Sequence, residues 1–301
     1  EGDFERVQYS YHRANRRGIL EVKAIEKAWG PHLLRFGVSW EGEIKGKQDG
    51  NALADFQFTR LNALNAEAGL QLELGTRLAL RADWYQPVDY IGLFFLRPNF
   101  EAERSDQDFY ARNSRFAEYE IDHFAGGVDA GVSLGRWGEA RGGIRAGWLS
   151  GELELGRLVI PDFRRRTMSW VGRLRVEHLD SIYFPKSGFH LGADYQEFSK
   201  LLNSSDHYRK LYGEVAGAIG TSWVRFAVVG RAGSDLKSSI PAYDSYQLGG
   251  FESQSGYRQE ELSGENFVSG RAGVLIKLPV SKTLMWKRVY LLGLADSGMV
   301  M

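Results

Sequence analysis

The chain has 301 residues, with 38 basic and 38 acidic side chains and no cysteine. Balanced charge gives no overall field for nucleic acid or an acidic partner, and the lack of thiols excludes disulfides and thiolate metal sites. No apolar run approaches the roughly 18 residues that a membrane-spanning helix needs. The 36 glycines, 17 phenylalanines and 14 tyrosines against 7 prolines indicate many strands and tight turns.

The first segment of the chain differs in pattern from the rest. Residues 4–11 and 18–25 have the pattern of two short strands, joined by a basic turn at residues 13–18. A two-stranded hairpin alone is at best marginally stable in water, so we expect residues 1–28 to be the end of a domain whose earlier part is not in this sequence. Residues 29–301 are expected to form a second domain.

From residue 29 onward the hydrophobic pattern has a period of two. Apolar side chains occupy one face of each segment and charged side chains the other, which indicates half-exposed antiparallel strands. The clearest segments are residues 34–40, 52–59, 66–73, 77–84, 141–148, 168–177, 224–231 and 271–278. Residues 90–100 and 208–219 do not assign their apolar side chains cleanly to one face.

A soluble β-sandwich would give the same alternation, but three features favour a membrane barrel. Arg, Glu and Asp recur at strand centres on the polar face, Trp40, Trp84 and Trp148 end apolar faces like aromatic girdles, and short and long connections alternate. We therefore predict an all-β protein, a transmembrane antiparallel β-barrel, with about thirteen strands in this chain. Because bacterial barrels close with an even number of strands and an open edge is costly in lipid, we expect C-terminal strands to be missing.

A long polar segment, residues 248–264, separates the two last clear strand patterns. Tight hairpins need two to five linking residues, and loops beyond about 12–15 residues are usually functional or disordered. Gly249, Gly250 and Gly264 are expected to be its hinges, because glycine adopts backbone conformations that other residues avoid. We predict a structured loop with a function.

Five segments resemble the BamA/TamA superfamily of 16-stranded outer-membrane barrels. Residues 2–27 are similar to the last two strands of a POTRA module, and residues 28–37 to the entry into the first barrel strand. Residues 84–89 resemble a periplasmic turn, residues 180–191 a hairpin entry with an FP-x-x-G motif, and residues 248–257 the tip of the sixth extracellular loop. Within the superfamily, the chain most resembles the POTRA and barrel part of patatin-like phospholipase proteins, the type Vd autotransporters.

The resemblance implies that the loop folds into the lumen and touches the inner wall. Its tip residues are Gln254, Ser255, Gly256 and Tyr257. Tyr257 and Gly256 are expected to dock the tip, and Asp296 and Gly298 resemble the motif on the facing wall strand. BamA-like proteins have arginine where this chain has Ser255, whereas the patatin-linked branch is expected to have serine, and a hydroxyl cannot replace a bidentate guanidinium.

The function implied by the resemblance is an outer-membrane barrel that anchors, and helps to translocate, an upstream patatin-like phospholipase domain. The POTRA end would lie in the periplasm, and outer-membrane lipids and lipopolysaccharide would be partners. An assembly factor of the TamA or BamA kind and a passive pore are alternatives. Homodimerisation stays open, and no nucleic-acid partner is expected.

Catalytic and metal chemistry is not expected in this chain. Residues 131–135 match the G-x-S-x-G motif, but Ser133 ends a strand pattern and no helical pattern comes after it, as a nucleophile elbow would require. The six histidines show no metal-ligand spacing, and no cofactor motif is present. The basic run at residues 164–166 lacks interleaved aromatic residues and is expected to face lipopolysaccharide or water.

Overall fold

The computed structural model describes residues 4–14, 17–26, 32–42, 48–111, 114–156, 160–181, 185–251, 253–278 and 289–301. Apart from three short 3₁₀ turns, this part of the chain is all β: one antiparallel sheet of 13 strands and two separate two-stranded sheets. The predicted fold class and strand number are confirmed. In the same residues, no helix is long and apolar enough to cross a membrane.

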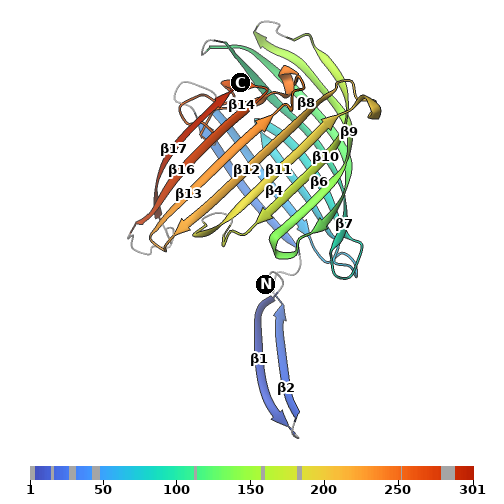
Figure 1. Ribbon diagram of the computed structural model, residues 1–301, viewed down its shortest axis with the longest axis vertical. Coiled ribbons are helices and arrows are strands. Elements are labelled where there is room, and N and C mark those ends of the chain that lie inside the picture. The colour runs from blue at the N-terminus through green and yellow to red at the C-terminus, as the bar shows by residue number, and fades with distance from the viewer. Residues whose placement is uncertain are drawn as a thin grey trace.

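The strands of the large sheet pair in chain order, from β3 at one edge to β17 at the other. Their bounds are β3 (Leu33–Gly42), β4 (Gln48–Phe58), β5 (Glu67–Gly75), β6 (Arg77–Pro87), β7 (Phe94–Ala111), β8 (Ser114–Ser133), β9 (Gly138–Gly156), β10 (Phe163–Glu177), β11 (Ser187–Phe198), β12 (Tyr208–Gly220), β13 (Val224–Ser234), β16 (Phe267–Leu278) and β17 (Val289–Val300). Figure 1 shows the sheet curling into a barrel wall, with β4 and β6 behind β11 to β13. Within the described residues β3 and β17 are not paired, so the wall has two edges.

The N-terminal hairpin consists of β1 (Phe4–Ala14) and β2 (Arg17–Glu26), which pair with each other as a sheet of their own. Figure 1 shows it projecting away from the end of the wall at which β3 begins. The predicted domain boundary, between residues 28 and 29, lies outside the described residues.

The period-two alternation sorts the side chains onto two faces of the wall. On the outer face, Phe36 and Val38 of β3 are 76% and 85% exposed, and Phe226 and Val228 of β13 are more than half exposed. Soluble proteins rarely expose contiguous rows of large apolar side chains, whereas a membrane barrel places them against lipid. The charged residues of the same strands lie on the inner face.

Strands β7, β8, β9 and β10 have 18, 20, 19 and 15 residues, longer than the ten or so expected from the pattern. At their far ends the two faces exchange character. The inner face carries an apolar cluster with Tyr119 and Ile121 at its centre and Phe163 packed on it. The outer face there carries Arg104, which donates to both oxygens of Asp122 at 2.7 and 2.9 Å. The long strands therefore rise beyond the lipid-facing belt.

The connection between β13 and β16, residues 235–266, is the long loop that the sequence predicts. It contains a small ribbon of β14 (Tyr246–Leu248) and β15 (Leu262–Gly264), and it follows the eleventh strand of the sheet. Figure 1 shows it at the end of the wall opposite the β1–β2 hairpin. The carboxylate of Glu260 accepts from the backbone N of Asp108 on β7 at 3.0 Å, so the loop reaches a strand distant from β13 and β16 in the sheet order.

Candidate functional site

Glycines shape the tip of the long loop. Gly249 and Gly250 have φ angles of 137° and 78°, in the region that side chains with a Cβ rarely adopt. A Cβ on Gly249 would collide with the carbonyl oxygen of Arg258. The backbone N of Gly250 donates to the Tyr257 carbonyl at 3.0 Å, and that of Tyr257 to the Gln254 carbonyl at 3.1 Å. The tip is thus a compact turn closed on itself.

Gly264 serves a different purpose from the other two glycines. Its φ is not positive, but a Cβ there would lie 2.8 Å from the carbonyl oxygen of Met301, just beyond β17. Asn266 and Met301 exchange two backbone hydrogen bonds, of 3.0 and 2.8 Å. Gly264 therefore allows the loop to return close against the wall strand.

Ser255 joins the loop tip to the inner wall. Its Oγ donates to Asp296 Oδ2 at 2.7 Å, and its backbone N donates to Asp296 Oδ1 at 3.2 Å. Asp296 lies directly opposite Arg271 in the β16–β17 register, with the guanidinium 3.4 Å from the same carboxylate. Arg271 also donates to the carbonyl oxygen of Phe251 in the loop. The wall supplies both charges of this junction, and the loop supplies a hydroxyl and backbone groups.

Gln254 is the most deeply buried of the four tip residues, with 3% of its surface exposed. It lies over Gly298 of β17, where a Cβ would come 2.6 Å from Gln254 Nε2 and 3.0 Å from Ser269 Cβ. A side chain at position 298 would require the Gln254 amide to move, so the glycine makes room for this buried tip residue.

Tyr257 and Gly256, which the resemblance placed at the docking surface, are both exposed residues of the tip. The Tyr257 side chain is 45% exposed, and a Cβ on Gly256 would meet no atom within 4 Å. In the described part of the chain, Gln254 and Ser255 hold the contacts with Gly298 and Asp296. Arg271 was missed, although the alternation along β16 and an antiparallel register opposite Asp296 would have found it.

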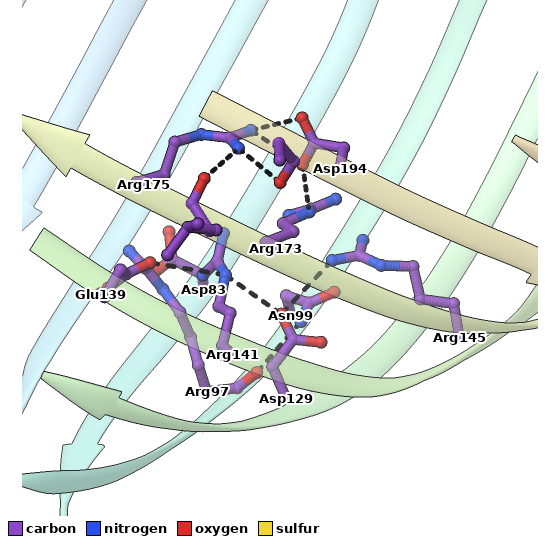
Figure 2. A network of polar contacts seen from close by, with 12 residues as sticks. Asp83, Arg97, Asn99, Asp129, Glu139, Arg141, Arg145, Arg173, Arg175 and Asp194 are labelled. Carbon is purple, nitrogen blue, oxygen red and sulfur yellow. Dashed lines mark hydrogen bonds and ion pairs between the residues drawn. The ribbon is translucent and has the colours of Figure 1, made fainter. Parts of the chain in front are cut away.

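A second polar site covers the inner wall on β6 to β11, and Figure 2 shows its side chains converging from these strands. Its charged members are Asp83, Arg97, Asp129, Glu139, Arg141, Arg145, Arg173, Arg175 and Asp194. We call this set the arginine wall. Its five guanidinium groups face four carboxylates, so the patch keeps a small excess of positive charge.

Asp129 is the centre of the arginine wall. It is fully buried, and its Oδ2 lies 3.6 Å from Arg141 Nε and 3.6 Å from Arg145 Nη2. A Cβ on the neighbouring Gly143 would collide with Asp129 Oδ1, so glycine makes room for the carboxylate. At the edge of the patch, Arg175 makes two hydrogen bonds to Asp194, of 2.8 and 2.6 Å. The result is a cross-strand brace made of ion pairs.

Ser133 lies at the end of β8, where its Oγ accepts from the backbone N of Gly135 at 3.2 Å. The chain then passes through the three-residue 3₁₀ turn η1 (Gly135–Trp137) directly into β9. A nucleophile elbow needs a strand followed by a helix, with the serine on the sharp turn between them. The local structure is strand, turn and strand, which gives Ser133 no such position.

Two turns at the end of the wall nearer the hairpin are held by aspartates. Asp180 Oδ1 accepts from the backbone N of Lys186 at 2.7 Å and of Ser187 at 3.1 Å, and these hydrogen bonds lower the pKa of Asp180. The backbone N groups of Phe94 and Leu93 lower the pKa of Asp89 in the same way. Residues 182–184 of the FP-x-x-G segment lie outside the described residues.

The Omp85 superfamily domain matches residues 64–301, more than half of the chain. The chain belongs to the Omp85 superfamily. No curated protein matches the sequence.

Three solved structures are similar to this Omp85 chain over nearly the whole length of the chain. BamA from Haemophilus ducreyi lacking POTRA domains 1–3 has a TM-score of 0.68 and 15% identity, covering 99% of this chain and 63% of that one. CdiB from Escherichia coli has a TM-score of 0.68 and 16% identity, covering 98% and 56%. CdiB from Acinetobacter baumannii has a TM-score of 0.63 and 13% identity, covering 99% and 56%.

The chain therefore spans 56% to 63% of the length of these proteins. At such identities the similarity establishes the fold. Family and fold together identify this chain as a bacterial outer-membrane β-barrel of the Omp85 type. The predicted resemblance to the BamA/TamA superfamily is thereby confirmed.

Proposed function

We propose that this Omp85 barrel is the membrane anchor of a type V secretion protein and helps to translocate an upstream patatin-like phospholipase domain. Ser255 is the observation that carries the proposal. The patatin-linked branch is expected to have serine at this position, and here the hydroxyl hydrogen-bonds Asp296 while Arg271 of the wall provides the positive charge. An arginine at position 255 would bring a second guanidinium to a carboxylate that already has one.

In this proposal the β1–β2 hairpin is the end of a POTRA module and lies in the periplasm, so the long loop faces the cell exterior. The similarity of residues 2–27 to POTRA strands supports this orientation. The hairpin forms a sheet separate from the barrel wall, as the end of a distinct module would. The barrel itself has no enzymatic activity, since Ser133 lies in a strand–turn–strand segment.

The test begins with the coding region upstream of Glu1 and continues with the full-length protein in bacteria. Hydrolysis of a fluorogenic phospholipid is measured on intact cells. We expect surface activity that disappears when the serine of an upstream G-x-S-x-G elbow is changed to alanine and persists in Ser133→Ala. An upstream array of POTRA modules without a hydrolase would contradict the proposal.

An assembly factor that inserts other barrels is the second candidate, and the similarity to BamA is the observation that favours it. Depletion of the protein would then lower the amounts of other outer-membrane barrels, measured by quantitative mass spectrometry of outer-membrane fractions. Under the anchoring proposal those amounts stay unchanged and only the surface lipase activity falls.

A further inference from the structure

The outer face of the barrel carries a groove of about 1090 Å³ across β5 to β10, toward the end of the wall that holds the long loop. Two of its lining residues, Phe124 and Trp148, are 46% and 48% exposed although they are large and aromatic. Arg104, Asp122 and Arg164 line the same groove. An apolar surface and charged groups thus meet in one concave site.

Strand register arranges the lining residues in two neighbouring rows. The lower row, in which each residue is the cross-strand partner of the next, is Leu72, Leu80, Ala102, Phe124 and Trp148. The upper row is displaced by two residues toward the end of the wall that holds the long loop. It consists of Leu78, Arg104, Asp122, Ser150 and Arg164. From β5 to β9 the lower row is entirely apolar, whereas its next position, on β10, is Arg166; most of the upper row is charged or polar.

The step between these rows marks the edge of the lipid-facing belt. Phe124 contacts Phe100 on one side and Trp148 on the other, with ring centroids 4.9 and 6.3 Å apart. Aromatic girdles of outer-membrane barrels lie at the boundary between acyl chains and headgroups. The groove therefore straddles that boundary, with its floor at the level of acyl chains and its rim at the level of headgroups.

We propose that this groove binds a phosphorylated glycolipid of the outer leaflet. An acyl chain would cover the floor, the guanidinium groups of Arg104 and Arg164 would bind a phosphate, and Asp122 and Glu152 would accept hydrogen bonds from sugar hydroxyls. The inference rests on the orientation in the proposed function, because only that orientation places this end of the barrel in the outer leaflet.

The mixed charge of the rim selects this occupant. Arg104 is held by two hydrogen bonds to Asp122 and by an ion pair with Glu120 at 3.3 Å. Half of its side chain is still exposed, so the guanidinium is pre-oriented and accessible. A simple anionic phospholipid such as phosphatidylglycerol would use the arginines, but its headgroup brings fewer hydroxyl donors than a sugar does for the carboxylates of Asp122, Glu152 and Asp162. A phosphorylated sugar satisfies both kinds of group.

The experiment measures binding of fluorescently labelled lipopolysaccharide to the purified barrel in detergent, by anisotropy. We expect the double variant Arg104→Ala/Arg164→Ala to lose affinity by about tenfold or more, since two charge-assisted contacts are removed. Arg209→Ala is the matched control: Arg209 is exposed at the same end of the wall, on β12 and outside the groove. Its affinity should stay within about twofold of the unaltered protein.

Unlabelled competitors identify the ligand class. Equal affinity of the double variant and the unaltered protein would overturn the proposal, as would phosphatidylglycerol displacing the probe as well as lipopolysaccharide does. Cell-surface labelling at Lys237→Cys in the long loop tests the orientation separately. Labelling without groove binding would reject the glycolipid site and leave the proposed function standing, whereas a loop that is unlabelled on intact cells would reject the orientation.

Discussion

The inner wall uses arginine in two ways, and the two regions differ in where the partners come from. At the loop junction, Arg271 and Asp296 of adjacent strands form an ion pair, and the Asp296 carboxylate also accepts a hydrogen bond from Ser255 of the loop. In the arginine wall, charged residues of β6 to β11 pair among themselves, and Asp129 at the centre is fully buried. The same alternation of apolar and charged residues thus produces a binding site for the loop in the first region and a cross-strand brace in the second.

The difference has an energetic consequence. Removing one partner from a buried set of charges leaves the others uncompensated in a site of low dielectric. The free-energy cost of this loss is larger than the net stabilisation that the ion pair provides when it forms. A hydrogen bond from the neutral hydroxyl of Ser255 contributes far less, because this loop residue is exposed and water can replace it, while Asp296 keeps its ion pair with Arg271. The brace should therefore govern stability, and the junction should govern the position of the loop.

Asp129→Ala is expected to have the largest effect, lowering the free energy of unfolding by about 3 kcal/mol, because Arg141 and Arg145 lose their common counterion. The measurement is unfolding by guanidinium chloride in detergent micelles, followed by tryptophan fluorescence. Asp194→Ala is the comparison, since its carboxylate is 31% exposed and its loss should cost only about 1 kcal/mol. Equal losses in the two variants would mean that burial does not distinguish the brace from its edge.

Gly298→Ala should act on the loop by steric displacement. The new Cβ would lie 2.6 Å from Gln254 Nε2, and overpacking of this kind costs about 1–3 kcal/mol. We expect faster cleavage by trypsin after Arg258, measured by mass spectrometry of the loop fragments. Gly270→Ala on the adjacent strand is the control, because the nearest atom to its Cβ lies 3.9 Å away. Unchanged cleavage in Gly298→Ala would show that the tip does not depend on this contact.

Ser255→Ala removes the hydroxyl but keeps the backbone hydrogen bond to Asp296. The loss should be about 1 kcal/mol in the docking equilibrium of the tip, seen as an increase of about fivefold in the rate of tryptic cleavage at Arg258. Ser255→Thr retains a hydroxyl and should behave like the unaltered protein. If both variants are cleaved equally fast, the hydroxyl makes no contribution to docking.

Sequence periodicity was sufficient to predict the strands, their faces and the position of the loop, because a half-exposed strand needs only local alternation. It failed where inner-face residues are themselves apolar. Phe95 of β7 points inward with 2% of its surface exposed, and its ring contacts that of Tyr85 with the centroids 4.9 Å apart. Residues 90–100 therefore carry apolar side chains on both faces. The exchange of faces at the far ends of β7 to β10 blurs the pattern further.

The loop contacts could be predicted only in part. The resemblance pointed to Ser255 and Asp296, which the structure places within hydrogen-bond distance. The contact between Glu260 and Asp108 joins residues 152 positions apart, and no local pattern encodes such a pairing. The contacts of Asp129 with Arg141 and Arg145 likewise depend on the register of β8 against β9, which alternation alone leaves undetermined.

Asp180→Asn tests a third use of a charged group, the holding of a turn, and should have the smallest effect. Hydrogen bonds from Lys186 and Ser187 lower the pKa of Asp180 in the folded state, so the carboxylate stabilises the fold above its unfolded pKa and this contribution is lost as the pH falls through the folded pKa. Unfolding midpoints should therefore differ slightly between variant and unaltered protein at about pH 7 and converge in acid. A difference that persists in acid, once the carboxyl group is protonated in both the folded and the unfolded state, would mean that the turn is held by the shape of the side chain and not by its charge.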